Sequence, residues 1–345
     1  MSERNDPVLS IRDLVVRFDV PEGTVHAVEG VSYDVGPGET LGVVGESGCG
    51  KSVTVMAALG LLPCPPARVV GGEAVLEGRD LLRLSPRELR SVRGKEIAMV
   101  FQDPMTSLHP AYTVGDQVAE AVRAHDAGRS GQAAWGRAVE LLELVGVPDA
   151  GARARTYPHQ WSGGMRQRAM IAMAIAHRPK VLIADEPTTA LDVTVQAQVL
   201  DVLRQVQQET SSAIVLITHD LGVIAEMADR VVVMYAGRVV ETGDTTAIFR
   251  TPHHPYTAGL LACLPRLELE GQPLPAIPGA PPNLVDPPAG CAFHPRCGLR
   301  QGRARCVVEV PALADVGEGH RAACHFSEEL AKTPLAAPPE TAARR

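Results

Sequence analysis

A glycine-rich stretch that ends in a lysine and a serine constrains this chain more than any other feature. The stretch follows the short apolar run Leu41 to Val44 and reads Gly45-Glu46-Ser47-Gly48-Cys49-Gly50-Lys51-Ser52. Glycines let the backbone curl so that successive N–H groups point at one anion, and the lysine adds a positive charge. A strand is predicted before the stretch and a helix after it, as in a phosphate-binding loop. The sequence therefore predicts a nucleotide-binding α/β protein in which Ser52 ligates Mg²⁺.

A second buried strand is predicted at Val181 to Ala184, and the carboxylates of Asp185 and Glu186 follow it directly. Open α/β sheets bind their ligands at the carboxyl ends of strands, so both residues are placed for chemistry on a nucleotide. We expect Asp185 to hold Mg²⁺ and Glu186 to orient or deprotonate the attacking water. Acidic residues after a strand also serve as helix N-caps, but the glycine-rich loop in the same chain favours the catalytic interpretation.

The third motif opens a predicted helix and reads Trp161-Ser162-Gly163-Gly164-Met165-Arg166-Gln167-Arg168. With this motif the chain resembles the ATPase subunits of ABC transporters, whose signature is a serine and two glycines at a helix start. The resemblance implies that Ser162, Gly163 and Gly164 contact the γ-phosphate of a nucleotide bound to the opposite subunit. Exposed N–H groups at a helix N-terminus are suited to an anion. Neither ATP site is then complete in one subunit.

The same resemblance assigns roles to residues at other positions. Gln102 ends a short apolar strand and is expected to contact Mg²⁺ and the attacking water, and to report the nucleotide state to a transmembrane partner. His219 is expected to contact the γ-phosphate, and Asp192 lies in the loop that crosses the dimer interface. Phe18 is expected to stack on the adenine, with Tyr33 as the alternative.

The hydrophobic pattern fits the fold that the resemblance implies. Residues 8–18 and 25–35 alternate apolar and polar side chains, which predicts an N-terminal antiparallel β-layer. Apolar runs without alternation predict covered strands in a core sheet. Residues 103–176 are mainly helical in pattern and are expected to form an inserted helical subdomain. The predicted fold class is α/β, an ABC-type P-loop ATPase with a mixed sheet core and a nucleotide-binding domain at residues 1–263.

The composition changes beyond Cys263, where prolines are too frequent for a helix or a central strand. We expect an irregular C-terminal appendage at residues 264–326 and a disordered tail at residues 327–345. The appendage contains four cysteines at an irregular spacing unlike that of zinc ribbons, namely Cys291, Cys297, Cys306 and Cys324.

In a reducing compartment such a group of cysteines favours a metal over disulfides. The resemblance implies a [4Fe–4S] cluster held by the four thiolates. Zinc is the alternative, in a mixed site with His294, His320 or His325, since thiolates suit both metals. Buried cysteines without any metal are the third interpretation.

Three further segments resemble the oligopeptide and dipeptide importer branch of the family. They are Phe101-Gln102-Asp103-Pro104-Met105-Thr106-Ser107-Leu108-His109-Pro110, the methionine-bearing signature, and His254-Pro255-Tyr256-Thr257. The resemblance extends roughly over residues 8–326. It implies a subunit that hydrolyses ATP in a head-to-tail ATPase dimer and powers import of di- and oligopeptides. The implied partners are a second ATPase, expected to be a paralogue, two transmembrane permeases and an extracytoplasmic solute-binding protein.

Other functions are weighed against peptide import. A nickel or other small-solute importer stays open, because the ATPase does not select the solute. A soluble ABC ATPase of repair or translation is less consistent with a single compact cassette. The net charge of −7 gives no basic field, which argues against nucleic acid as a partner. Without a signal peptide or an apolar stretch of about 18 residues, the chain is expected at the cytoplasmic face of the membrane, bound through the permeases.

Overall fold

The computed structural model describes residues 6–126, 128–189, 191–264, 276–317 and 319–331. Contacts within the chain divide it into two units, which are described separately. The first unit comprises Met1–Leu9, Asp34–Thr40 and Leu76–Ile217. The second unit comprises Ser10–Tyr33, Leu41–Val75 and Thr218–Arg345.

The core of the first unit contains parallel strands formed by apolar runs. Strand β6 (Ile97–Val100) pairs with β7 (Val181–Asp185), and β7 pairs with β8 (Ala213–Thr218), whose last residue belongs to the second unit. Every residue of β7 is buried. Such continuous burial is typical of parallel strands, because both faces are covered. The prediction of a buried strand at residues 181–184 is confirmed.

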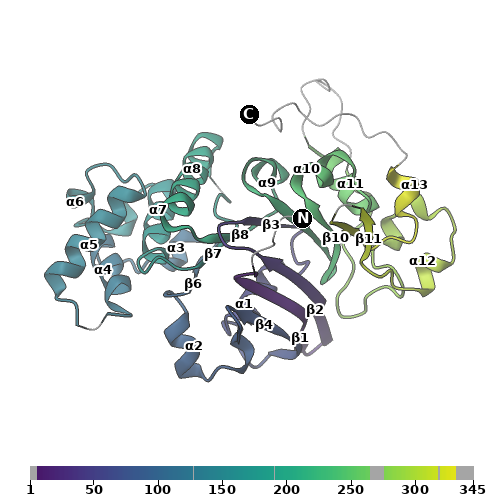
Figure 1. Ribbon diagram of the computed structural model, residues 1–345, viewed down its shortest axis with the longest axis horizontal. Coiled ribbons are helices and arrows are strands. Elements are labelled where there is room, and N and C mark those ends of the chain that lie inside the picture. The colour runs from purple at the N-terminus through teal and green to yellow at the C-terminus, as the bar shows by residue number, and fades with distance from the viewer. Residues whose placement is uncertain (1–5, 127, 190, 265–275, 318, 332–345) are drawn as a thin grey trace. The chain divides into compact units, whose positions relative to one another are not determined.

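Helices make up most of the rest of the first unit (Figure 1). Helices α4, α5 and α7 pack against one another, and they form the helical segment that the sequence predicts. Thr113, Ser130 and Ser162 begin these helices, and each side chain accepts a hydrogen bond from the N–H three residues later. The remaining bounds are β5 (Arg79–Asp80), η1 (Leu81–Arg83), α2 (Pro86–Val92), α3 (Pro104–Ser107), α4 (Val114–Arg123), α5 (Gly131–Leu144), α6 (Ala150–Arg153), η2 (Pro158–Gln160), α7 (Gly163–Ala174) and α8 (Val193–Thr210).

The second unit contains the expected antiparallel β-layer and a mixed sheet. In the layer, β1 (Leu9–Val20) lies between β2 (Gly23–Val35) and β4 (Ala67–Leu76). In the sheet, β3 (Thr40–Val44) runs parallel to β9 (Arg230–Tyr235), which forms an antiparallel hairpin with β10 (Arg238–Asp244). The hairpin turn has positive φ at both central residues, 49° at Ala236 and 75° at Gly237, as a type I′ turn requires.

The C-terminal residues of the second unit extend this sheet. Strand β12 (His320–Ala322) pairs with β10 and with β11 (Ala314–Gly317). The described residues 276–293 form no helix or strand, as their prolines predict. The helices of this unit are α1 (Lys51–Ala58), α9 (Leu221–Met227), α10 (Thr245–Arg250), α11 (Pro255–Ala262), η4 (His294–Arg296), η5 (Gly298–Arg300), α12 (Arg305–Val308) and α13 (Ser327–Ala331).

Helix α13 differs from the expectation of a disordered tail at residues 327–345. Glu329 of this helix accepts two hydrogen bonds from Arg303, at 3.1 and 2.8 Å, so residues 327–331 are ordered by the appendage. The rest of that tail lies outside the described residues. No helix in the described part of the chain is both long and apolar enough to cross a membrane.

Candidate nucleotide-binding and catalytic site

The glycine-rich loop of the second unit has the backbone conformation that its glycines allow. The φ angles are 155° at Gly45, 79° at Gly48 and 99° at Gly50. A Cβ atom on Gly45 would lie 2.2 Å from the carbonyl oxygen of Met234, and one on Gly50 would lie 2.4 Å from that of Ala27. Both positions therefore need glycine for space as well as for conformation.

Lys51 closes this loop from the first turn of α1. It is only 5% exposed, and its Nζ donates to the carbonyl oxygens of Gly45 at 2.8 Å and Glu46 at 3.1 Å. Gly50 is the N-cap of α1 and has no side chain to accept from the first N–H groups of the helix. A positive side chain and a helix N-terminus thus lie together, which suits a phosphate group.

Cys49 lies inside the same loop, and its thiol is unreactive. The side chain is buried, and burial raises the pKa of its thiol, although the nearby charge of Lys51 acts in the opposite direction. The thiol is therefore neutral at physiological pH, and the thiolate is the form that reacts or binds metals. Cys49 is a packing residue of the loop.

The acidic pair lies at the carboxyl end of β7 in the first unit. Asp185 is 5% exposed at the strand end, and Glu186 has a φ of 48°, in the left-handed region. The Glu186 carboxylate accepts from Gln102 Nε2 at 2.8 Å and from Thr189 Oγ1 at 2.9 Å. Two residues that the sequence assigned to catalysis, Gln102 and Glu186, are thus in contact. No sequence pattern marks Thr189 as a partner of Glu186, because a single threonine in a loop carries no motif.

The serine and glycines of the signature begin helix α7. Ser162 and Gly163 are exposed, and the Ser162 Oγ accepts from the N–H of Met165 at 3.3 Å. Gly164 is buried, and a Cβ there would lie 2.3 Å from Cγ1 of Val195 in α8. Gly164 therefore allows α7 and α8 to approach closely, while Ser162 and Gly163 face outwards.

The remaining predicted positions differ in their exposure. Asp192 is exposed and caps α8, accepting from the N–H of Val195 at 3.0 Å. His219 is exposed directly after β8. Phe18 is half-buried in β1, whereas Tyr33 in β2 is only 7% exposed, and burial raises the pKa of its hydroxyl.

Arg296 of the C-terminal appendage and Tyr256 of α11 contact the loop through Glu46. The carboxylate accepts from Arg296 Nη1 at 2.7 Å and Nη2 at 2.9 Å, and the Glu46 N–H donates to the Tyr256 hydroxyl at 2.7 Å. The hydrogen bond to Glu46 raises the pKa of Arg296 further above its ordinary value. Neither contact is predictable from the sequence, since an arginine or a tyrosine gives no local sign of a distant partner.

The four appendage cysteines line one pocket of the second unit. Cys291, Cys297, Cys306 and Cys324 surround it together with His294 and His325. The Cys291 N–H donates to the Cys306 carbonyl at 3.0 Å. Burial raises the pKa of the Cys324 thiol to about 12, and neighbouring thiols add to the shift. Within the described residues, however, no group of three or more His, Cys, Asp or Glu side chains has an arrangement that could hold a metal ion.

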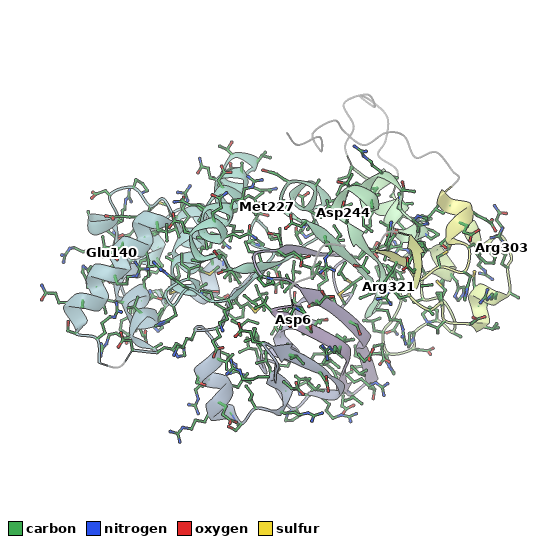
Figure 2. The ribbon with its side chains drawn as sticks, in the orientation of Figure 1. Asp6, Glu140, Met227, Asp244, Arg303 and Arg321 are labelled. Atoms are coloured by element: carbon green, nitrogen blue, oxygen red, sulfur yellow. The ribbon has the colours of Figure 1, made fainter. Side chains whose placement is uncertain are left out.

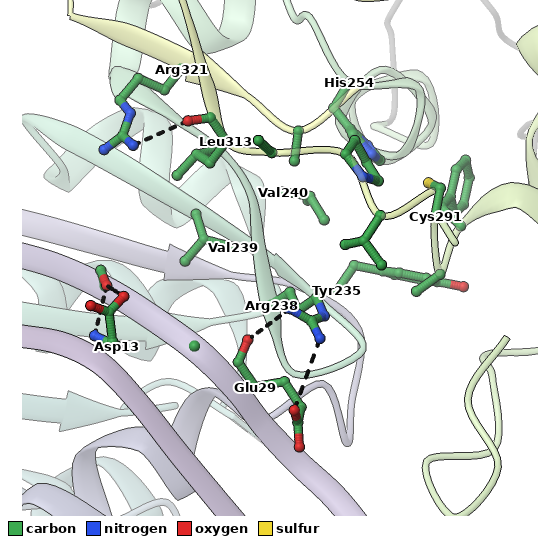
Figure 3. Close-up of a pocket in the computed structure, with 18 residues that line it drawn as sticks. Asp13, Glu29, Tyr235, Arg238, Val239, Val240, His254, Cys291, Leu313 and Arg321 are labelled. Atoms are coloured by element: carbon green, nitrogen blue, oxygen red, sulfur yellow. Dashed lines mark hydrogen bonds and ion pairs between the residues drawn. The ribbon is translucent and has the colours of Figure 1, made fainter. Parts of the chain in front are cut away.

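A separate cavity of about 360 Å³ lies where the appendage covers strands of the second unit (Figure 3). Asp13 and Glu29 come from β1 and β2, Arg238 from the hairpin, and Cys291 from the appendage. Arg238 donates to the Glu29 carbonyl at 3.1 Å, and its other nitrogen lies 3.9 Å from the Glu29 carboxylate. None of the residues assigned to nucleotide binding lines this cavity.

The phosphate loop, the acidic strand end and the serine-glycine helix start define a nucleotide-hydrolysing ATPase. Comparison with family sequence models agrees with this class: the ABC transporter model matches residues 28–189. A model described as the oligopeptide/dipeptide transporter C-terminal region matches residues 240–306.

Curated relatives resemble the chain over nearly its whole length. The dipeptide transport ATP-binding protein DppD of Bacillus subtilis is 50% identical over 327 residues, which cover 95% of this chain and 97% of DppD. The oligopeptide transport ATP-binding protein OppD of the same organism is 55% identical over 287 residues, covering 83% of this chain and 80% of OppD. The chain therefore belongs to the ATP-binding proteins of the oligopeptide/dipeptide ABC transporter family.

Solved structures support the same fold. The ATP-binding cassette MJ0796, described as a dimer in a post-hydrolysis state with ADP and Pi, has a TM-score of 0.61 and 26% identity. The similarity covers 69% of this chain and 98% of MJ0796. The predicted ABC ATPase fold is thereby confirmed.

Proposed function

We propose that this chain is the ATP-hydrolysing subunit of an importer of di- and oligopeptides. The observation that carries the proposal is the near full-length similarity to DppD, which continues through the C-terminal region that marks this transporter group. In this role the chain lies at the cytoplasmic face of the membrane and is bound there through permease subunits. Its nucleotide-binding domain comprises residues 1–263 and includes a helical subdomain at residues 103–176. Its appendage comprises residues 264–326.

ATP binding is assigned to the loop from Gly45 to Ser52. The loop N–H groups hold the phosphates, and Lys51 supplies a positive charge to them. Phe18 stacks on the adenine. Its half-buried position supports this choice over Tyr33, whose ring is enclosed in the β-layer.

The donor atoms for Mg²⁺ are assigned to Ser52, Gln102 and Asp185. Hydroxyl, amide and carboxylate oxygens are the ligands that this hard cation prefers. Gln102 uses its Nε2 to donate to Glu186, so its amide oxygen is the atom that remains for the cation. When bound, Mg²⁺ neutralises charge on the phosphate oxygens during transfer.

Glu186 is the proposed catalytic carboxylate. It orients the attacking water and accepts its proton as the water oxygen bonds to the γ-phosphorus and the bond to the bridging oxygen breaks. The hydrogen bonds from Gln102 and Thr189 hold its carboxylate in place. His219 contacts the γ-phosphate and stabilises the charge that develops there.

The active assembly is a head-to-tail pair of ATPase subunits. Ser162, Gly163 and Gly164 of one subunit contact the γ-phosphate at the loop of the other, and Asp192 lies at the interface. The outward position of Ser162 and Gly163 supports this role. The second ATPase is a paralogue, and two permeases and an extracytoplasmic solute-binding protein complete the importer.

The four cysteines of the appendage are proposed to hold a [4Fe–4S] cluster, with zinc as the alternative. Their convergence on one pocket supports a shared ligand. Metals bind the thiolate form of cysteine, so the four side chains would bind as thiolates and would have to move closer together. Anaerobically purified protein should contain about four iron and four sulfide per chain. Zinc alone would favour the alternative, and protein without metal would exclude both.

Peptide uptake tests the proposed function directly. Cells carrying Glu186→Gln should lose uptake of labelled dipeptides and longer peptides, because hydrolysis powers transport. Glu140→Gln, which alters an exposed carboxylate of α5, serves as the matched control and should keep full uptake (Figure 2). Expression of the three proteins is compared by immunoblot.

The same cells are also tested for nickel uptake. Loss of nickel uptake with intact peptide uptake would assign the chain to a metal importer. Retention of both activities in Glu186→Gln cells would contradict the transport proposal while leaving ATP hydrolysis to be assayed separately.

A further inference from the structure

Glu46 is the second residue of the phosphate loop, and its carboxylate contacts Arg296 of the appendage. Its carboxylate is held by both terminal nitrogens of Arg296, at 2.7 and 2.9 Å. This two-point geometry is specific to arginine, whose planar guanidinium matches a carboxylate. The side chain of Arg296 is 5% exposed and that of Glu46 is 24% exposed, so the pair is largely protected from water and salt.

Arg296 is itself fixed by further contacts. Its Nε donates to the carbonyl of Pro278 at 2.9 Å, and Nη1 lies 3.3 Å from the hydroxyl of Tyr235. The guanidinium also lies over the rings of Tyr235 and Phe293, at 5.8 and 5.9 Å from their centres. Arg296 therefore reaches Glu46 from a rigid site rather than from a free surface.

A second contact fixes the backbone of the same loop residue. The Glu46 N–H donates to Tyr256 at 2.7 Å, and the Tyr256 ring packs on Tyr235 at a centre distance of 4.6 Å. Figure 3 shows Tyr235 beside Cys291 of the appendage. Because Lys51 donates to the Glu46 carbonyl at 3.1 Å, whatever orients Glu46 also orients the carbonyl that holds the lysine.

We propose that Arg296 is a positioning residue for ATP: it holds Glu46 and thereby keeps the phosphate loop in its binding conformation. The appendage thus contributes to nucleotide affinity without touching the nucleotide. The inference rests on the assignment of residues 45–52 to ATP binding. Arg296 itself lies outside all of the nucleotide-binding motifs.

The experiment measures KM and kcat for ATP in the assembled transporter, and the dissociation constant of MgATP by titration of the full chain. Arg296→Gln should raise KM and the dissociation constant about tenfold, as loss of a supporting partner does in comparable sites, with kcat within about twofold. Glu46→Gln should have a similar effect, and Arg296→Lys an intermediate one, because lysine keeps the charge but not the two-point geometry.

The double variant Arg296→Gln with Glu46→Gln separates positioning from general damage. If the two residues act through one contact, the double variant should bind ATP no more weakly than either single variant. Additive effects would overturn the proposal, and so would unchanged ATP affinity in Glu46→Gln, which remains decisive if Arg296→Gln fails to fold.

Arg303→Gln is the matched control. Arg303 of the appendage (Figure 2) makes a two-point pair with Glu329 of α13, and its loss should leave the KM for ATP unchanged. If the KM for ATP rose equally in this variant, the effect of Arg296→Gln would arise from impaired folding of the appendage, and the proposal would be overturned. Lys51→Ala tests the assignment of residues 45–52 to ATP binding. If Lys51→Ala still binds ATP, that assignment fails. If Lys51→Ala loses ATP binding but Arg296→Gln keeps the native affinity, only the positioning role of Arg296 is overturned.

Discussion

Glu186 shows how a single residue combines strained backbone with an aimed side chain. Its φ of 48° is rare for a residue with a Cβ, and its N–H donates to the Ile217 carbonyl at 2.8 Å. Such strain persists where surrounding contacts over-determine a residue, and it is frequent at active sites. The position of Glu186 after a strand was predictable from the sequence. Its backbone conformation and its contact with Thr189 were not, because they depend on a loop closing on itself.

The cysteines Cys49 and Cys64 should differ in reactivity. Cys64 is exposed, whereas Cys49 is buried with a raised pKa, so its reactive thiolate is scarce. We expect a maleimide at neutral pH to label Cys64 much faster than Cys49 in the folded chain, as measured by peptide mass spectrometry. Labelling in guanidinium chloride provides the control, where both should react quickly. Equal rates in the folded chain would contradict the burial of Cys49.

At the scale of elements, packing decides whether a glycine within a helix can be replaced by a residue with a side chain. Gly136 lies in the middle of α5, where an added Cβ would meet nothing within 4 Å. Gly164 lies in the first turn of α7, where an added Cβ would meet Val195 at 2.3 Å. The packing between α7 and α8 leaves no room for a side chain at Gly164, whereas Gly136 has open space.

Gly136→Ala should therefore stabilise the chain, by about 0.5–1 kcal/mol, since alanine loses less backbone entropy in a helix. Gly164→Ala is the contrasting variant and should destabilise it, because α7 and α8 would be forced apart. Urea denaturation monitored by circular dichroism gives both values from the shift in midpoint. A lower urea midpoint for Gly136→Ala than for the native chain would show that this position has no space for a side chain.

His254 makes one helix start sensitive to pH. Its Nδ1 accepts from the Tyr256 N–H at 3.1 Å and caps α11, and burial lowers the pKa of His254 to about 4 from an ordinary value of 6.5. The unfolded chain thus takes up a proton first as the pH falls below 6.5. This group therefore makes stability decline as the pH falls from about 6.5 to about 4.

His254→Asn should reduce this part of the acid sensitivity, because asparagine also caps helices but does not titrate. The measurement is the free energy of unfolding at a series of pH values for the native chain and the variant. A parallel decline in both proteins between pH 6.5 and 4 would assign the acid sensitivity to other groups.

At the scale of the whole molecule, the proposed ATP site is shared with a second ATPase subunit. The Glu186→Gln variant should bind ATP but lose nearly all hydrolysis. It should therefore associate with its ATPase partner only when MgATP is present. Size-exclusion chromatography with light scattering measures this association. The variant that also carries Lys51→Ala should stay unassociated, because it lacks nucleotide binding. Full residual hydrolysis in the purified Glu186→Gln assembly would remove the assignment of Glu186 as the catalytic carboxylate.

The sequence by itself determined the class of this protein. The glycine-rich loop, the acidic strand end and the signature are each contiguous, because backbone N–H groups that converge on one phosphate must come from neighbouring residues. The buried strands were predictable for a similar reason, since covered parallel strands show continuous apolar runs. Such local patterns carry their meaning without knowledge of distant parts of the chain.

Only the tertiary structure decided which distant residues support these motifs. Arg296 and Glu46 are 250 positions apart, and nothing in the spelling of either segment predicts their contact. The four cysteines stand close together in the sequence, but their shared pocket, which His254 and Pro255 also line, forms only when the appendage folds against the start of α11. Contacts of this kind arise from packing and burial, which make a buried arginine and a carboxylate partners only after the chain has brought them together.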